Sequence, residues 1–117
     1  MLLYNLSMFT PEEAQERIAE MVRLIVKRFQ PHRIYLFGSR ARGDAGPDSD
    51  VDLLIVMPIL GSKLSKRVEI RMALHDVKMA KDIAIVTPEE YARYYKIPGT
   101  LPRIAEKEGK LLYERAA

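Results

Sequence analysis

Residues 33–57 read RIYLFGSRARGDAGPDSDVDLLIVM, and this stretch decides the fold. Its first five residues are rich in aromatic and β-branched side chains and run into Gly38, which is typical of a buried strand. Residues 38–49 hold three glycines and a proline and predict a loop, in which Ser39 to Arg42 can open a short helix. Residues 51–57 are apolar on both faces after an acidic start, which indicates a central strand. The loop is too short for a crossover connection, so the two strands are expected to be antiparallel.

Helix-capping signatures flank this pair of strands. Thr10-Pro11-Glu12-Glu13 supplies a capping hydroxyl, a proline at the first helical position and a glutamate three residues after the cap. Apolar residues then recur at helical spacing as far as Phe29. Thr87-Pro88-Glu89-Glu90 repeats the signature and predicts a later helix. Ser62 can cap a helix between them, and the apolar positions expected to be buried there are Leu64, Val68, Met72 and Val77.

The remaining segments complete an α/β (α+β) fold. Residues 83–86 predict a third strand, entered through Asp82, and the helix that precedes it predicts a parallel pairing with residues 51–57 through a right-handed crossover. A short helix is expected from about Leu101 to Glu108, and residues 110–113 can add an edge strand. The predicted order is α-β-turn-β-α-β-α-α-β with a mixed sheet, in one domain over residues 1–117.

The composition argues against several classes of protein and of functional site. The chain has 117 residues, of which 48% are hydrophobic and 30% charged, and no cysteine, so disulfides, cysteine-zinc sites and thiol nucleophiles are excluded. No apolar run approaches the ~18 residues that cross a bilayer, and the first residues lack the features of a secretory signal. The net charge of +3 comes without a Lys/Arg block, so direct nucleic-acid binding is not expected. We expect a cytoplasmic protein without a membrane partner.

Two features at the ends of the predicted strands are suited to phosphate chemistry. Gly38-Ser39 lies where a strand turns into a short helix, so backbone N–H groups there can meet an anion, although such a pair is most often only a turn. Asp50 and Asp52 flank Val51 at the start of a strand, so both carboxylates are expected on one face. They can form a solvated acidic loop end, or hold a hard cation such as Mg²⁺ or Mn²⁺.

Asp82 adds a third carboxylate. If its strand runs parallel to residues 51–57, both strands begin at the same end of the sheet, and Asp82 falls beside Asp50 and Asp52. Three carboxylates facing a phosphate-binding turn match a two-metal phosphoryl-transfer site, in which the ions sit ~3.5–4 Å apart.

These residues carry a resemblance to a known family. Gly38-Ser39, ten intervening residues and then Asp50-Val51-Asp52 match the signature G-S-x₁₀-D-x-D of the DNA polymerase beta superfamily of nucleotidyltransferases. Residues 36–44, 47–56, 82–90 and 108–114 resemble its minimal nucleotidyltransferase (MNT) family, and the resemblance spans about residues 14–115.

The resemblance implies roles for these side chains. Gly38 and Ser39 would bind nucleotide phosphate, and Asp50, Asp52 and Asp82 would be the catalytic metal ligands, with Asp82 facing the acceptor hydroxyl. Guanidinium groups pair well with phosphate, so Arg40 and Arg42 are further candidates for binding the nucleotide, or for surface ion pairs with Asp44 or Asp48. His32 and His75 receive no role.

The resemblance also implies a partner. MNT proteins are typically paired with a small helical HEPN-domain toxin, and act as antitoxins by binding it or by transferring AMP from ATP to one of its tyrosines. The alternatives are a non-enzymatic module that masks its partner, and a homodimer that transfers a nucleotide to a small molecule. An aromatic cluster (Tyr91, Tyr94, Tyr95, Ile97) is either core packing or the interface with a partner.

Overall fold

The computed structural model describes residues 9–116 as a four-stranded mixed sheet with helices on both faces. The helices are α1 (Pro11–Phe29), α2 (Ser39–Arg42), α3 (Lys63–Ala73), α4 (Pro88–Tyr94) and α5 (Leu101–Glu108). The strands are β1 (Arg33–Phe37), β2 (Val51–Val56), β3 (Lys81–Val86) and β4 (Lys110–Glu114). This order confirms the predicted α/β fold, including the short helix at the Gly38 turn and the last strand.

The sheet has the order β3-β2-β1-β4. β1 pairs antiparallel with β2 and with β4, and β2 pairs parallel with β3, as the connections predict. Because β2 and β3 are in register and parallel, their first residues lie at the same end of the sheet. This end carries the acidic residues singled out in the sequence.

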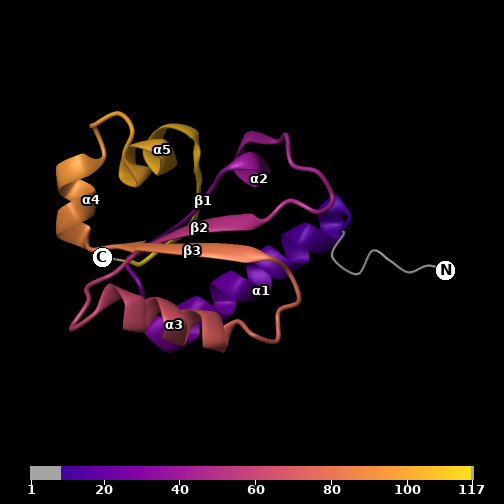
Figure 1. Ribbon diagram of the computed structural model, residues 1–117, viewed down its shortest axis with the longest axis horizontal. Coiled ribbons are helices and arrows are strands. Elements are labelled where there is room, and N and C mark those ends of the chain that lie inside the picture. Colours follow the sequence, from indigo (N-terminus) through magenta and orange to yellow (C-terminus); the bar gives the residue numbers. More distant parts are fainter. Residues whose placement is uncertain (1–8, 117) are drawn as a thin grey trace.

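Each face of the sheet has its own apolar core. In Figure 1, α1 and α3 lie below the sheet, and α4 and α5 lie above it. Strand alternation places Leu53 and Ile55 among side chains of α1 and α3, and Leu54 and Val56 with Tyr91 of α4 and Ala105 of α5. Asp52 is two residues from Leu54, so it belongs to the face of α4 and α5.

The helix starts follow the predicted capping signatures. The Thr10 hydroxyl accepts a hydrogen bond from the Glu13 backbone N–H, and the Glu13 carboxylate accepts one from the Thr10 N–H. Thr87 and Glu90 form the same reciprocal pair at the start of α4. Each box satisfies two backbone donors that a helix start leaves without intrahelical acceptors.

The prediction of which α3 residues are buried is wrong for three of its four positions. Leu64, Val68 and Met72 are exposed, whereas Ile70 and the C-capping residue Leu74 are fully buried. At 100° per residue, Ile70 lies opposite the stripe formed by the other three, so one helix can bury only one of the two sets. Val77 is buried as predicted, but in the turn after α3. Among residues 9–116, no helix is long and apolar enough to cross a membrane.

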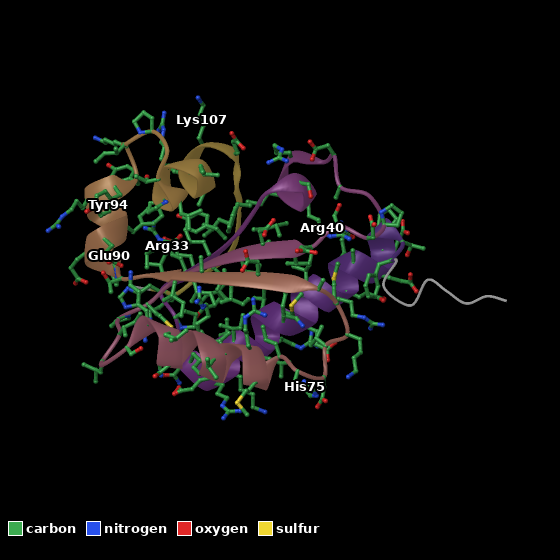
Figure 2. All side chains as sticks on the ribbon, viewed as in Figure 1. Arg33, Arg40, His75, Glu90, Tyr94 and Lys107 are labelled. Atoms are coloured by element: carbon green, nitrogen blue, oxygen red, sulfur yellow. The ribbon has the colours of Figure 1, made fainter. Side chains whose placement is uncertain are left out.

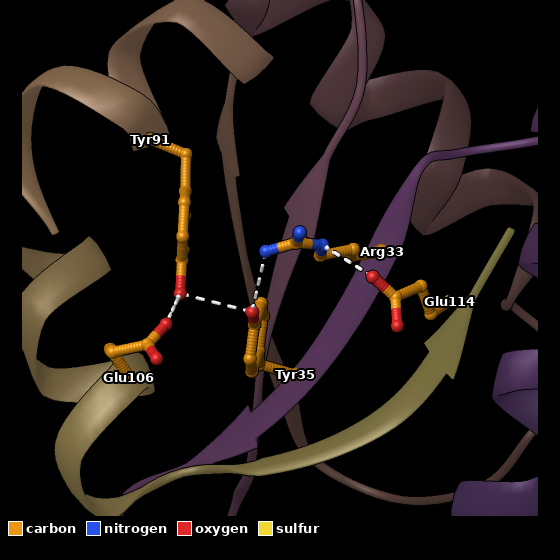
Figure 3. A network of polar contacts seen from close by, with 5 residues as sticks. All are labelled: Arg33, Tyr35, Tyr91, Glu106 and Glu114. Atoms are coloured by element: carbon orange, nitrogen blue, oxygen red, sulfur yellow. Dashed lines mark hydrogen bonds and ion pairs between the residues drawn. The ribbon is translucent and has the colours of Figure 1, made fainter. Parts of the chain in front are cut away.

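A network of hydrogen bonds and an ion pair connects α4 and α5 to the sheet (Figure 3). The Tyr91 hydroxyl is hydrogen-bonded to the Glu106 carboxylate and, at 2.9 Å, to the Tyr35 hydroxyl. Arg33 donates to the Tyr35 oxygen at 3.1 Å and pairs with Glu114 of β4 at 3.2 Å. Burial and the two hydrogen bonds raise the pKa of Tyr91, so its phenol stays protonated.

The aromatic cluster is therefore divided between core and surface. The Tyr91 ring stacks on those of Tyr35 and Tyr95, with centroids 5.6 and 5.9 Å apart. Tyr91 is buried and Tyr95 is half-buried, whereas Tyr94 and Ile97 are exposed. The core interpretation holds for Tyr91, and the exposed pair remains a candidate contact surface.

Candidate active site

The candidate site forms where β1 ends and β2 and β3 begin. Asp52 pairs in register with Phe37 at the end of β1 on one side and with Asp82 of β3 on the other. Strand alternation keeps Asp52 and Asp82 on the same face of the sheet, two residues before the positions that α4 and α5 cover. The two acidic positions predicted to converge are thus neighbours.

Gly38 brings the turn into contact with this carboxylate pair. Its backbone has a φ of +76°, a conformation that glycine adopts readily, and a Cβ there would lie 2.2 Å from Oδ2 of Asp52. Only a residue without a side chain can therefore occupy this position while Asp52 keeps its place. The two halves of the G-S-x₁₀-D-x-D signature meet at this contact.

The neighbouring carboxylates affect the ionisation of Asp52. Burial raises the pKa of Asp52, and the charges of Asp82 and then Asp50 raise it further, while Arg42 opposes the shift. Closely spaced carboxylates in a half-buried setting are stabilised by a cation. Oxygen donors of this type suit Mg²⁺ or Mn²⁺, so the donor set fits a divalent ion that Asp52 and its neighbouring carboxylates would hold.

The side chains are not arranged as ligands in this conformation. Between residues 9 and 116, no group of three acidic or histidine side chains stands ready to hold a metal ion. The exposed Asp82 carboxylate instead pairs with Arg71 of α3, with 3.6 Å between Nη2 and Oδ1. An exposed pair of this kind contributes roughly 0–1 kcal/mol, so an incoming cation can displace it.

The two candidate arginines differ in their contacts. Arg40 donates to the backbone carbonyl oxygens of Ser49 (2.8 and 3.0 Å) and Gly46 (3.4 Å), and so holds the loop that leads into β2. Figure 2 shows Arg40 beside this loop and Tyr94 at the opposite end of the molecule. Arg42 pairs with Asp44 at 3.4 Å, as its surface interpretation predicts, and also with Glu108 at 4.0 Å. Of the two, Arg42 is the one whose charge acts on Asp52.

Sequence reasoning did not identify Arg71 as a neighbour of the site. Arg71 lies near the end of α3, and the turn that follows brings the chain back to Asp82 at the start of β3. No motif marks it, because the contact depends on how α3 packs against β3. Its charge also lowers the pKa of Lys81, after the larger effect of burial.

Comparison with known proteins agrees with this geometry. The family profile described as "Polymerase beta, Nucleotidyltransferase" matches residues 19–117. Among curated proteins, none matches the chain.

Solved structures share the fold at low sequence identity. A protein from Sulfolobus solfataricus described as a nucleotidyltransferase superposes with a TM-score of 0.66 at 22% identity, covering 98% of this chain and 93% of that one. A toxin–antitoxin complex with AMP-PNP gives 0.60 at 19%, covering 86% and 73%. A tri-AMPylated Shewanella oneidensis HEPN toxin in complex with its MNT antitoxin gives 0.56 at 17%, covering 86% and 72%. The signature, the site geometry and the matched profile together place this chain in the polymerase beta nucleotidyltransferase family.

Proposed function

We propose that this protein is an MNT-type antitoxin that transfers AMP from ATP to a tyrosine hydroxyl of a small helical HEPN-domain partner. The observation that carries the proposal is the convergence of Gly38, Asp52 and Asp82 at one end of the sheet. Support for the acceptor comes from the structural relatives, one of which contains an AMPylated HEPN toxin.

Each residue of the candidate site has a separate role in the proposed transfer. Gly38 and Ser39 bind the triphosphate through backbone N–H groups and the Ser39 hydroxyl, and Arg42 adds positive charge. Asp50, Asp52 and Asp82 would hold two Mg²⁺ or Mn²⁺ ions, which supply Lewis-acid stabilisation of the phosphate charge. Asp82 accepts the phenol proton as the tyrosine oxygen bonds to the α-phosphorus. The bond from that phosphorus to its bridging oxygen breaks, and pyrophosphate leaves.

A phenol suits this site chemically. Its pKa near 10 is far below that of an aliphatic alcohol, so deprotonation demands less of Asp82. Asp82 is also well exposed, which leaves room for an acceptor that arrives on another protein.

The test begins with the neighbouring reading frame, which should encode a HEPN-domain protein, and continues with a transfer assay on that protein. Incubation with ATP and Mg²⁺ should add one or more AMP units to that protein, detected by intact-mass spectrometry, and Asp82→Asn should stop the addition. Asp48→Asn, an exposed carboxylate outside the trio, is the matched control and should leave transfer unchanged. If the wild type neutralises the partner without a mass change, and Asp82→Asn neutralises it equally well, the protein is a masking module instead.

A further inference from the structure

The outer face of α3 carries an apolar stripe that the chain's own core does not use. Leu64, Val68 and Met72 are 62%, 47% and 73% exposed. Their spacing of four residues places them on one side of the helix, opposite the buried Ile70. The stripe runs for about 12 Å at 1.5 Å per residue. Exposed apolar residues gathered on one face in this way mark a contact surface.

The charges beside the stripe favour an acidic partner. Along α3, Lys63, Lys66, Arg67 and Arg71 outnumber a single acidic residue, Glu69. Lys63 pairs with Glu90 and Lys66 with Glu69, which leaves the two arginines as the cations that a partner would meet. Arg67 and Arg71 flank the stripe, and among the described residues Arg67 has no acidic side chain within 4 Å. Two copies packed through this face would bring like charges together, whereas an acidic helix would complement them.

The stripe also ends at the candidate active site. Met72 follows Arg71, whose guanidinium pairs with Asp82 at 3.6 Å. A helix lying along α3 therefore has one end beside the acceptor side of the site. A carboxylate on that helix would compete with Asp82 for Arg71.

We infer that the outer face of α3 is the docking surface for an acidic amphipathic helix of the acceptor protein, an inference that rests on the proposed function. The partner helix lays its apolar side on Leu64, Val68 and Met72 and its carboxylates on Arg67 and Arg71. This is the helix-on-helix mode of recognition, in which apolar anchors recur every three or four residues.

Binding of the proposed HEPN-domain partner, measured by calorimetry, tests the surface. Leu64→Glu and Arg67→Glu should each weaken binding at least tenfold, whereas Arg67→Lys should bind within about twofold of the wild type. Leu111→Glu, on the exposed part of β4, is the matched control and should not change affinity. Unchanged melting temperatures establish that the variants are folded, since both α3 side chains are exposed.

Three results overturn the inference. One is wild-type affinity in the two α3 variants, and a loss of binding in Ile97→Glu would then assign the contact to the exposed aromatic surface. Another is a wild-type homodimer in sedimentation that Leu64→Glu converts to a monomer, since a second copy then occupies the face.

The third is a wild type that does not bind the HEPN-domain protein, which overturns the proposed function as well. If the wild type binds through α3 but transfers no AMP, the docking surface stands and the proposed function fails. If the wild type transfers AMP and the α3 variants bind normally, the proposed function stands and the docking surface fails.

Discussion

Asp52 of β2 and Asp82 of β3 are direct partners across the parallel strand pair. Their carboxylates lie on one face of the sheet, and the charge of Asp82 contributes to the raised pKa of Asp52. Two carboxylates at this separation suit a divalent cation. Without a cation they repel each other and lower the free energy of unfolding, which can be measured.

Replacing Asp52 with asparagine should stabilise the protein at neutral pH. Burial is the main cause of the raised pKa, followed by Asp82 and Asp50. A carboxyl with a higher pKa in the folded state contributes stability below its ordinary pKa of 3.8, and this contribution is lost as the pH rises through the raised value. In thermal unfolding without metal, Asp52→Asn should therefore melt above the wild type at pH 7, with the gap closing below about pH 4. Asp48→Asn is the control, and a lower melting temperature for Asp52→Asn at pH 7 would contradict the prediction.

Nucleotide binding should depend on both acidic residues of the signature. The double variant Asp50→Asn, Asp52→Asn should keep its fold and lose Mg²⁺-dependent ATP binding in calorimetry. In the wild type, ATP and Mg²⁺ at 100 times the dissociation constant should add about 2.7 kcal/mol to the free energy of unfolding, because only the folded state binds. Unchanged affinity in a folded double variant would remove these residues from the metal site.

Gly38→Ala should cost more than the same change at Gly43. Both glycines have positive φ, which for alanine costs about 1–2 kcal/mol. At Gly43 no atom lies within 4 Å of the added Cβ, whereas at Gly38 Oδ2 of Asp52 lies 2.2 Å away. Overpacking of this kind adds about 1–3 kcal/mol. Urea unfolding measures the difference, and equal losses at the two positions would show that Asp52 moves aside freely.

Ser39 should assist the transfer without being essential. It begins α2 beside Gly38, and sequence places no histidine or lysine next to it that would activate its hydroxyl. We expect Ser39→Ala to lower the transfer rate about 10-fold to 100-fold, as loss of one phosphate-positioning contact does. A covalent nucleotide adduct on Ser39 in mass spectrometry would show that it attacks the phosphate instead.

The hydroxyl of Tyr91 should contribute to holding α4 against the sheet. Tyr91→Phe leaves the Glu106 carboxylate and the Tyr35 hydroxyl without this partner, at a cost of about 1–2 kcal/mol. Tyr94→Phe changes an exposed ring on the same helix and should stay within about 0.5 kcal/mol of the wild type. Chemical denaturation distinguishes the two, and equal stabilities would show that ring stacking alone positions α4.

The strands and caps could be predicted because their signals are local. A short aromatic and β-branched run before Gly38, an apolar run after Asp52, and two Thr-Pro-Glu-Glu caps each depend on neighbouring residues only. The parallel pairing of β2 and β3 followed from the helix between them, and it placed Asp82 beside Asp52.

The parts that sequence did not predict depend on packing between elements. The apolar spacing of α3 does not show which of its faces is buried, and Leu64, Val68 and Met72 fit a helical stripe as well as the buried Ile70 and Leu74 do. No motif predicts that Arg40 donates to the backbone carbonyl of Ser49 in the loop before β2. Arg71 meets Asp82 only after α3 is in place on β3.

During synthesis the strand order sets when the site can assemble. Gly38 and Asp52 are made early and can meet as soon as β1 and β2 form their antiparallel pair. Asp82 joins them only after the crossover through α3 closes, a non-local step slower than hairpin formation. β4 emerges later still, yet it flanks β1, the strand that leads into the Gly38 turn. A chain in which only β1 and β2 have paired therefore presents the turn and Asp52 without Asp82, so the candidate site is complete only after the crossover through α3 closes.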